Sequence, residues 1–245
     1  MLQVLKDQSI DQRALYYPER MMPTFWRRAL LVLSVAAIPA PAQQAREVLA
    51  RLDRFAPTFL AAKASIRSVT HTAVIDEDET ELGTFAVKRY APGKLRFLIA
   101  FTGENAKTVV IDDQLAQIYY PKIPEIQEYN TSKYRDLVQK LLLLGFGTAG
   151  RDIAASYEVR ELGRDSMESQ PASHLELIPK SVEVRKQVNR VELWIAEGTQ
   201  CPVQQTFHYP DGGYRKVTFL GVQLNPTLPA STFDLPKNVP RKRMN

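Results

Sequence analysis

The spacing of hydrophobic residues changes once along this chain, from a helical period to an alternating one. Between Gln44 and Leu60, hydrophobic side chains recur every three or four positions, and charged side chains fill the positions between them. This pattern predicts an amphipathic helix, which Pro57 ends or bends. The hydrophobic residues that define its buried face are Val48, Leu49, Leu52, Phe55 and Phe59.

Beyond residue 70 the period is two, which is typical of half-buried strands. Short polar or Gly/Pro segments separate most of these strands, so sequential strands can pair as hairpins. That spacing favours an antiparallel meander over β-α-β units. The predicted strands are 71–76, 82–89, 94–101, 107–112, 115–120, 125–130, 157–162, 172–179, 191–196, 203–209 and 214–224.

Alternation within the strands predicts one hydrophobic and one polar face for the sheet. In strand 94–101 every second position is hydrophobic, and the opposite face begins with Lys94 and Arg96. Strand 203–209 alternates in the same way, with Val203, Phe207 and Tyr209 on its hydrophobic face. An antiparallel sheet that is covered on a single face has this pattern.

A second helix is predicted in the longest break between strands. Residues 134–144 have a strongly hydrophobic C-terminal half, which ends at Gly145. Two substantial helices must then cover the hydrophobic face of about eleven strands. We therefore expect the sheet to curl and the helices to sit in its hollow, which gives a mainly β (α+β) fold.

The first 42 residues have the three parts of a secretory signal. Arg27 and Arg28 are followed by the uncharged run 29–38 and by Pro-Ala-Pro-Ala at 39–42. This run is shorter than the roughly 20 residues that a membrane-spanning helix needs, and a buried helix is the alternative. Export with cleavage after Ala42 leaves a single domain over 43–240 and a basic tail over 241–245, which we expect to be disordered.

Composition and charge exclude several classes of protein. Hydrophobic residues make up 44% and charged residues 24% of the 245 residues, as in ordinary globular domains. The net charge of +5 is too diffuse to indicate nucleic-acid binding, and no later hydrophobic run is long enough to span a membrane. The single cysteine, Cys201, cannot form an internal disulfide or a cysteine-based metal cluster.

Motifs for catalysis or cofactor binding are missing from the sequence. Residues 145–150 match G-x-G-x-x-G formally, but a helix is predicted before them where the nucleotide-binding motif needs a strand. The acidic run 76–81 lacks the spaced ligands and the glycine of a calcium loop. The three histidines, His71, His174 and His208, lie far apart in the sequence. We therefore expect no enzyme activity, no metal site and no cofactor.

One charged residue falls on the hydrophobic face of the predicted sheet. Alternation in strand 82–89 places Arg89 beside Phe85 and Val87. Two interpretations are open at this stage. An arginine at a strand end often extends to water, whereas a guanidinium at the rim of a cavity can donate to the backbone of a covering helix or to a lipid headgroup.

Several short segments follow one another in an order that is typical of one family. They are residues 83–89, 92–97, 110–112, 118–121, 126–127 and 233–237, preceded by Arg51-Leu52-Asp53 in the first helix. Over roughly residues 44–240, this order resembles the LolA-type carriers of outer-membrane lipoproteins. The chain departs from that family at a turn, where Asp112 is followed by Asp113 and not by the glycine that is common there.

The resemblance implies an incomplete barrel that is closed by the N-terminal helix and by a lid helix. It implies a periplasmic carrier that takes lipoproteins from an inner-membrane ABC transporter, shields their acyl chains and passes them to an outer-membrane acceptor. In the family, the strand arginine that Arg89 matches holds the lid closed. We expect a monomer that binds lipid and neither binds nucleic acid nor spans the membrane.

Both lines of reasoning predict a cavity for hydrophobic ligands. The predicted lining residues are Phe85, Val87, Leu95, Phe97, Ile99 and Phe101 from the sheet, with Leu141 and Leu144 from the lid. For each of them the alternative is an ordinary place in a filled core. A second hypothesis for the function also stays open, because relatives of this fold carry other lipids or act as envelope-stress sensors: a lipid-sensing regulatory or scaffold protein.

Overall fold

The structure is a computed structural model that describes residues 41–91, 94–112, 114–132 and 144–244. The predicted signal segment 1–42 lies outside the described residues, except for Pro41 and Ala42 in the first turn of α1. The predicted lid helix 134–144, including Leu141, also lies outside them, except for Leu144. The boundaries proposed for the mature domain therefore stay predictions.

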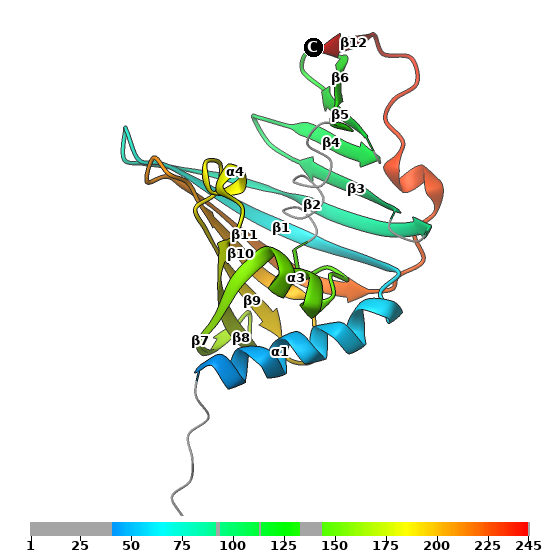
Figure 1. The fold of residues 1–245 in the computed structure, drawn as a ribbon. Helices are drawn as coiled ribbons and strands as arrows, with labels where there is room; N and C mark the ends of the chain where they lie inside the picture. Colours follow the sequence, from blue (N-terminus) through cyan, green and yellow to red (C-terminus); the bar gives the residue numbers. More distant parts are fainter. Residues whose placement is uncertain (1–40, 92–93, 113, 133–143, 245) are drawn as a thin grey trace, which may run out of the picture. The chain divides into compact units, whose positions relative to one another are not determined.

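The described part of the chain is built on one sheet of twelve strands (Figure 1). Sequential neighbours pair antiparallel from β1 to β6 and from β7 to β11, and β1 joins the two halves by pairing with β11. The spatial order runs from β12 and β6 at one edge to β8 and β7 at the other. Because these edges do not pair, the curled sheet stays open, and the predicted incomplete barrel is confirmed.

The strand bounds confirm most of the pattern read from the sequence. β3, β4, β5, β6 and β11 have the predicted limits. β2, β7, β8 and β9 are longer than predicted, β10 is shifted by one residue, β1 is largely displaced, and β12 was not predicted. The strands are β1 (Ala61–Thr72), β2 (Glu77–Ala91), β3 (Lys94–Phe101), β4 (Lys107–Asp112), β5 (Leu115–Tyr120), β6 (Glu125–Asn130), β7 (Tyr157–Met167), β8 (Gln170–Pro179), β9 (Arg190–Ala196), β10 (Pro202–His208), β11 (Tyr214–Leu224) and β12 (Arg241–Met244).

The central strand β1 is the main error in the prediction. A strand was expected over 71–76, whereas the structure has one over Ala61–Thr72 and a turn after it. Burial does alternate along its first half, with Ala62, Ala64 and Ile66 buried and Lys63 exposed. Alanine and serine at most of the buried positions weaken the hydrophobic contrast, so the period of two is hard to see in the sequence.

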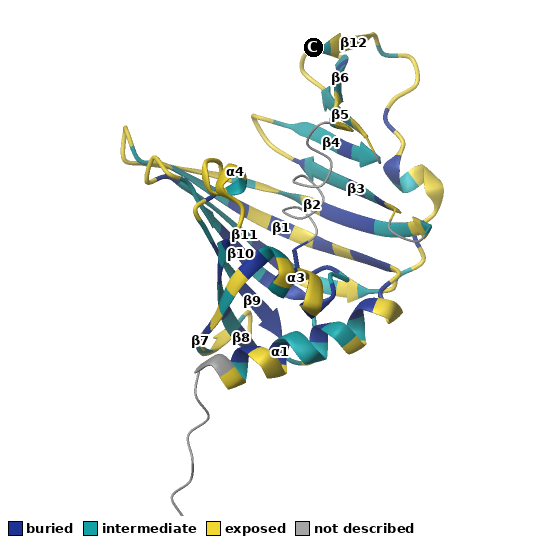
Figure 2. Cartoon of the chain, in the orientation of Figure 1, coloured by how far each residue is buried: buried dark blue, intermediate teal, exposed yellow. Residues whose placement is uncertain are grey.

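The described helices are short except for the first. They are α1 (Pro41–Phe55), η1 (Ala56–Thr58), α3 (Gly150–Ser156), α4 (Val182–Arg185) and η3 (Ala230–Phe233). The buried face of α1 packs with α3 against the inner face of β8 and β9 (Figures 1 and 2). Val48 and Leu52 of α1 belong to one buried cluster with Leu175 and Leu193 of these strands. None of the described helices is long and hydrophobic enough to cross a membrane.

The outer face of the sheet is not uniformly polar, contrary to the prediction. The chain after β11 returns across strands β2 to β6 and covers them with Leu228, Phe233 and Leu235. These side chains pack on Ala86 and Val110, which alternation places on the face opposite Phe85. Lys88 on the same face donates a hydrogen bond from Nζ to the carbonyl of Leu228. The sheet is therefore covered on both faces in this region.

The basic tail is ordered where the structure describes it, which corrects the expectation of disorder. Residues Arg241–Met244 form β12, which pairs parallel with β6 at the edge of the sheet. Arg241 Nη1 donates to Glu128 Oε1 over 2.8 Å. This bond, with Gln117 and the positive charges of the tail, lowers the pKa of Glu128.

Candidate functional site

A cavity of about 290 Å³ opens on the inner face of the sheet. The inner faces of β1, β2, β3, β10 and β11 form its floor, and Gln187 and Val188 from the segment after α4 lie at its side. Its wall is mostly hydrophobic and aromatic, which is typical of sites for small hydrophobic ligands. The lining residues are Ile66, Phe85, Ile99, Phe101, Gln187, Val188, Gln205, Phe207, Tyr209, Arg215, Val217 and Phe219.

The predicted lining residues divide into three groups. Phe85, Ile99 and Phe101 line this cavity. Val87, Leu95 and Phe97 lie on the same face but pack inside the hydrophobic cluster beside it. Leu144 is buried against β8 and β9 in the cluster around α1, and its carbonyl accepts a hydrogen bond from Gln205 Nε2 over 2.6 Å. Leu141 lies outside the described residues.

The other side of the cavity is formed by residues that were not among the predicted lining residues. Ile66 of β1 and Phe219 of β11 are paired across their strands and both face the cavity. Alternation along β11 could have identified Val217 and Phe219, but which strands face one another across a hollow depends on sheet order. Val203 was expected on the inner face, yet it packs on the outer face with Trp194, because a bulge near Pro202 shifts the register of β10.

Phe146 packs behind two aromatic residues of the cavity wall. The residue is 99% buried, and its ring centroid lies 4.9 Å from those of Phe85 and Phe219, which are themselves 5.3 Å apart. Gly147 follows with a φ of +66°, and a Cβ at that position would lie 2.4 Å from the ring of Phe59. The glycines of the G-x-G-x-x-G match therefore serve a tight turn and close packing.

Arg89 joins the sheet to two segments on its inner side. Its Nη1 donates to the carbonyl of Ala56 over 3.0 Å, and its Nη2 donates to the carbonyl of Gly147 over 3.2 Å. The guanidinium also lies 5.8 Å from the centroid of the Phe59 ring. Of the two interpretations open at the sequence level, the geometry favours donation to backbone carbonyls.

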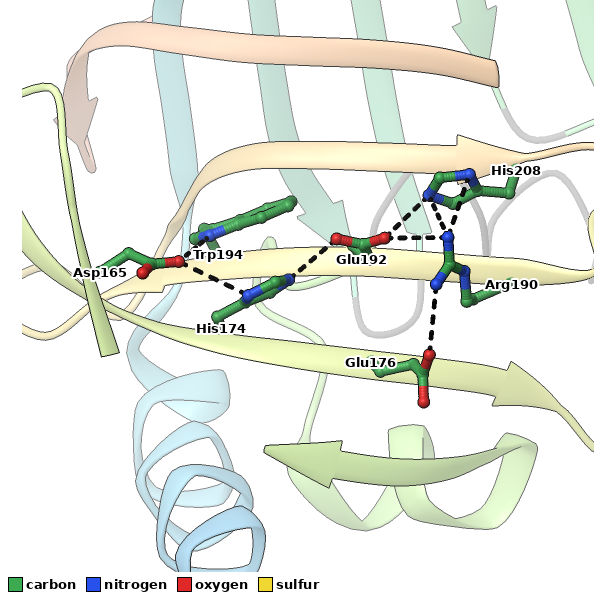
Figure 3. A network of polar contacts seen from close by, with 7 residues as sticks. All are labelled: Asp165, His174, Glu176, Arg190, Glu192, Trp194 and His208. Carbon is green, nitrogen blue, oxygen red and sulfur yellow. Dashed lines mark hydrogen bonds and ion pairs between the residues drawn. The ribbon is translucent and has the colours of Figure 1, made fainter. Parts of the chain in front are cut away.

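A polar network covers the outer face of β8, β9 and β10 (Figure 3). Its centre is Glu192, which accepts from Nε2 of both His174 and His208 over 3.0 Å. Arg190 links Glu192 to Glu176, with nitrogen–oxygen distances of 3.2 and 3.5 Å. Because hydrophobic residues of β9 face α1 on the other side, this network lies away from the cavity.

The remaining members of the network extend it along β8 and β9. The ring of His174 stacks on Trp194 at 3.9 Å, and Trp194 Nε1 donates to Asp165 over 2.8 Å. The third histidine, His71, likewise pairs with a carboxylate, Asp78, on the outer face. No group of three or more histidine, cysteine or acidic side chains among the described residues is arranged to hold a metal ion. Each histidine contacts a carboxylate on a neighbouring strand.

His208 and Cys201 are among the groups whose pKa burial shifts. Burial and the positive charge of Arg190 lower the pKa of His208 and outweigh the opposing effect of Glu192. Cys201 is fully buried in the cluster beside the cavity, and burial raises the pKa of its thiol to about 12. A thiol with this pKa stays protonated and is a poor nucleophile at neutral pH.

Solved structures share this fold at low sequence identity. MucB is 15% identical with a TM-score of 0.50, and the match covers 80% of this chain but only 64% of MucB. An uncharacterized conserved protein from Thermus thermophilus is 14% identical with a TM-score of 0.53, covering 82% of this chain and all of that one. A LolA superfamily protein from Nitrosomonas europaea matches at 13% identity and a TM-score of 0.38, covering 78% and 97%.

No protein-family model and no curated protein matches the sequence. At these identities the comparisons establish the fold and leave the ligand open. The observed fold is the open, curled sheet with helices on its inner side that the resemblance to LolA-type proteins implied.

Proposed function

We propose that the protein is a periplasmic carrier that binds acyl chains of lipoproteins, or of other lipids, and shuttles them from the inner to the outer membrane. The observation that carries this proposal is the hydrophobic cavity on the inner face of an open sheet. Each CH₂ group moved from water into such a cavity contributes about 0.8 kcal/mol, so the binding free energy of an acyl chain grows with its buried length. Binding of this kind needs no catalytic residue.

The size of the cavity supports a carrier whose inner side moves. Its volume of about 290 Å³ lies just below the range of about 300–1,000 Å³ that ligand sites span. A lipoprotein with several acyl chains needs more room. Displacing Phe146 from its place against Phe85 and Phe219 would enlarge the cavity into the hydrophobic cluster that also holds Phe59.

Arg89 is suited to control that movement. It connects β2 to the carbonyls on both sides of the inner cover, at Ala56 and Gly147. Hydrogen bonds from a charged donor contribute about 1.5–3 kcal/mol each when formed and can exchange with water when broken. A few such bonds hold a closed state without making it permanent, which a carrier requires for release.

Export and partners complete the proposal. The basic residues, hydrophobic run and Pro-Ala-Pro-Ala sequence over 27–42 support secretion to the periplasm. We propose that the protein acts as a monomer between an inner-membrane ABC transporter and an outer-membrane acceptor. The alternative is a lipid-sensing regulatory or scaffold protein. The fold that this chain shares with MucB is compatible with that alternative as well as with a carrier.

Cargo analysis tests the proposal and separates the two functions. The protein is purified from its native envelope without detergent, and its bound molecules are identified by mass spectrometry. The carrier proposal predicts lipoprotein or lipid acyl chains in the purified fraction. A stable protein partner with no acyl cargo would contradict it and support the regulatory alternative.

A further inference from the structure

One end of the cavity carries charged side chains. Arg215 lines the cavity, and its guanidinium carbon lies 5.6 Å from the centroid of the Phe101 ring. Lys107 Nζ lies 5.0 Å from the centroid of the same ring. Two cations therefore meet over one aromatic side chain of the cavity wall, although they come from strands on opposite sides of β1, β2 and β3.

One carboxylate partly neutralises this pair of cations. Glu81 Oε1 accepts from Lys107 Nζ over 2.7 Å, and its side chain is only 11% exposed. Its other oxygen, Oε2, lies 4.0 Å from Arg215 Nη2, beyond hydrogen-bond distance. Glu81, Lys107 and Arg215 together carry one positive charge in excess. Arg215 interacts more weakly with Glu81 than Lys107 does.

The guanidinium of Arg215 keeps donors for another partner. Its Nε donates to Ser68 Oγ over 3.1 Å, which fixes the direction of the group. Within the described part of the chain, its two terminal nitrogens make no hydrogen bond, and an arginine has five N–H donors. The side chain is 36% exposed, so a ligand group bound there stays at the boundary between the cavity and water.

The cavity runs from this cation toward its aromatic floor. Arg215, Val217 and Phe219 lie on the same face of β11 and all line it. Four residues along a strand span about 13 Å. An alkyl chain laid along β11 from Arg215 would therefore reach Phe219, whose ring packs against those of Phe85 and Phe146.

We propose that Arg215, supported by Lys107, binds an anionic group at the end of the ligand's alkyl chain. This inference rests on the proposed lipid-binding function and names the class of ligand: an amphiphile with one alkyl chain in the cavity and a carboxylate or phosphate at its rim. Arginine matches both groups, since it can donate two parallel hydrogen bonds to either. Glu81 orients Lys107 and sets the net charge of the site.

The test measures the dissociation constants of three dodecyl probes for the purified protein. Dodecanoate carries a carboxylate, dodecyl phosphate carries a phosphate, and dodecyl maltoside has the same chain with an uncharged head. We expect at least one anionic probe to bind about tenfold more tightly than the maltoside. The better of the two anions identifies the headgroup chemistry.

Substitutions assign the preference to this site. Arg215→Gln should remove most of the anion preference, and Glu81→Gln should increase it by removing the opposing charge. Lys216→Gln is the matched control, because it removes a cation one residue away on the outer face. That control should keep the preference of the unchanged protein.

A salt titration of the unchanged protein checks the result without any variant. Raising the ionic strength should weaken the binding of the anionic probe and leave the maltoside unaffected, since salt screens exposed charges. Equal affinities for charged and uncharged probes, or a preference that survives Arg215→Gln, would overturn the inference but leave lipid binding intact. Failure of all three probes to bind would instead contradict the proposed function.

Discussion

Arg89 and Gly147 are joined by a hydrogen bond of 3.2 Å between a guanidinium nitrogen and a backbone carbonyl. The bond connects β2 to the turn that places Phe146 against Phe85 of the cavity wall. A second bond from the same side chain reaches Ala56, the first residue of η1, directly after α1. One side chain thus holds both segments that cover this part of the inner face.

Replacing Arg89 should loosen that cover and speed release of the ligand. We expect Arg89→Leu to raise the dissociation rate of a bound hydrophobic fluorophore, N-phenyl-1-naphthylamine, about tenfold, because two charged hydrogen bonds are lost. Stopped-flow fluorescence measures that rate. Arg67→Leu is the control, since Arg67 is a half-exposed arginine on the outer face of β1. An unchanged dissociation rate in Arg89→Leu would contradict a role of Arg89 in ligand release.

Cys201 provides a probe of core opening because it is the single cysteine of the chain. Its side chain is buried and the pKa of its thiol is raised to about 12, so we expect maleimide labelling of the native protein to be very slow. Labelling should become rapid and complete in denaturant. Rapid stoichiometric labelling of the native protein would contradict the packing described around the cavity.

The stability of the fold should fall as pH is lowered below neutrality. Burial and Arg190 lower the pKa of His208, so the unfolded chain, with its ordinary histidine pKa of about 6.5, takes up a proton first. The stabilising contribution is therefore present above about pH 6.5 and is lost as pH falls toward the lowered pKa. Denaturant unfolding at pH 7 and pH 5 measures the effect, and His208→Gln should make it smaller.

Arg190→Gln gives the matched test of the cause. Removing the neighbouring positive charge should raise the pKa of His208 toward its ordinary value, as followed by the NMR signal of its ring proton. A His208 that titrates at or above the ordinary value in the unchanged protein would contradict the assignment.

The elements that the sequence predicted well are those with strong contrast between positions. β3 alternates large hydrophobic side chains such as Leu95 and Phe97 with lysine and arginine, and its predicted bounds are those observed. β1 places alanine and serine at buried positions, so its contrast is weak and it was largely missed. The cover over the outer face was also missed, because Leu228 and Phe233 lie in a segment without any regular period.

The candidate site was only partly predictable for a different reason. Alternation places Phe85, Val87 and Arg89 on one face, and that face is the inner one. Whether a side chain lines a cavity or fills a core depends on what stands opposite it across the hollow. Phe85 lines the cavity while Val87 is packed beneath neighbouring side chains, although the two are equivalent in the sequence pattern.

Filling the cavity is the sharpest test of ligand binding on the inner face of the sheet. Val217 faces the cavity from the middle of β11, whereas Lys216 beside it faces outward, so Val217→Trp and Lys216→Trp add similar bulk to opposite faces. The measurement is the equilibrium affinity of each purified protein for N-phenyl-1-naphthylamine, with circular dichroism to check the fold. We predict that the unchanged protein and Lys216→Trp bind the probe alike, and that folded Val217→Trp loses at least about tenfold in affinity. Equal binding by all three folded proteins would contradict a ligand site on the inner face.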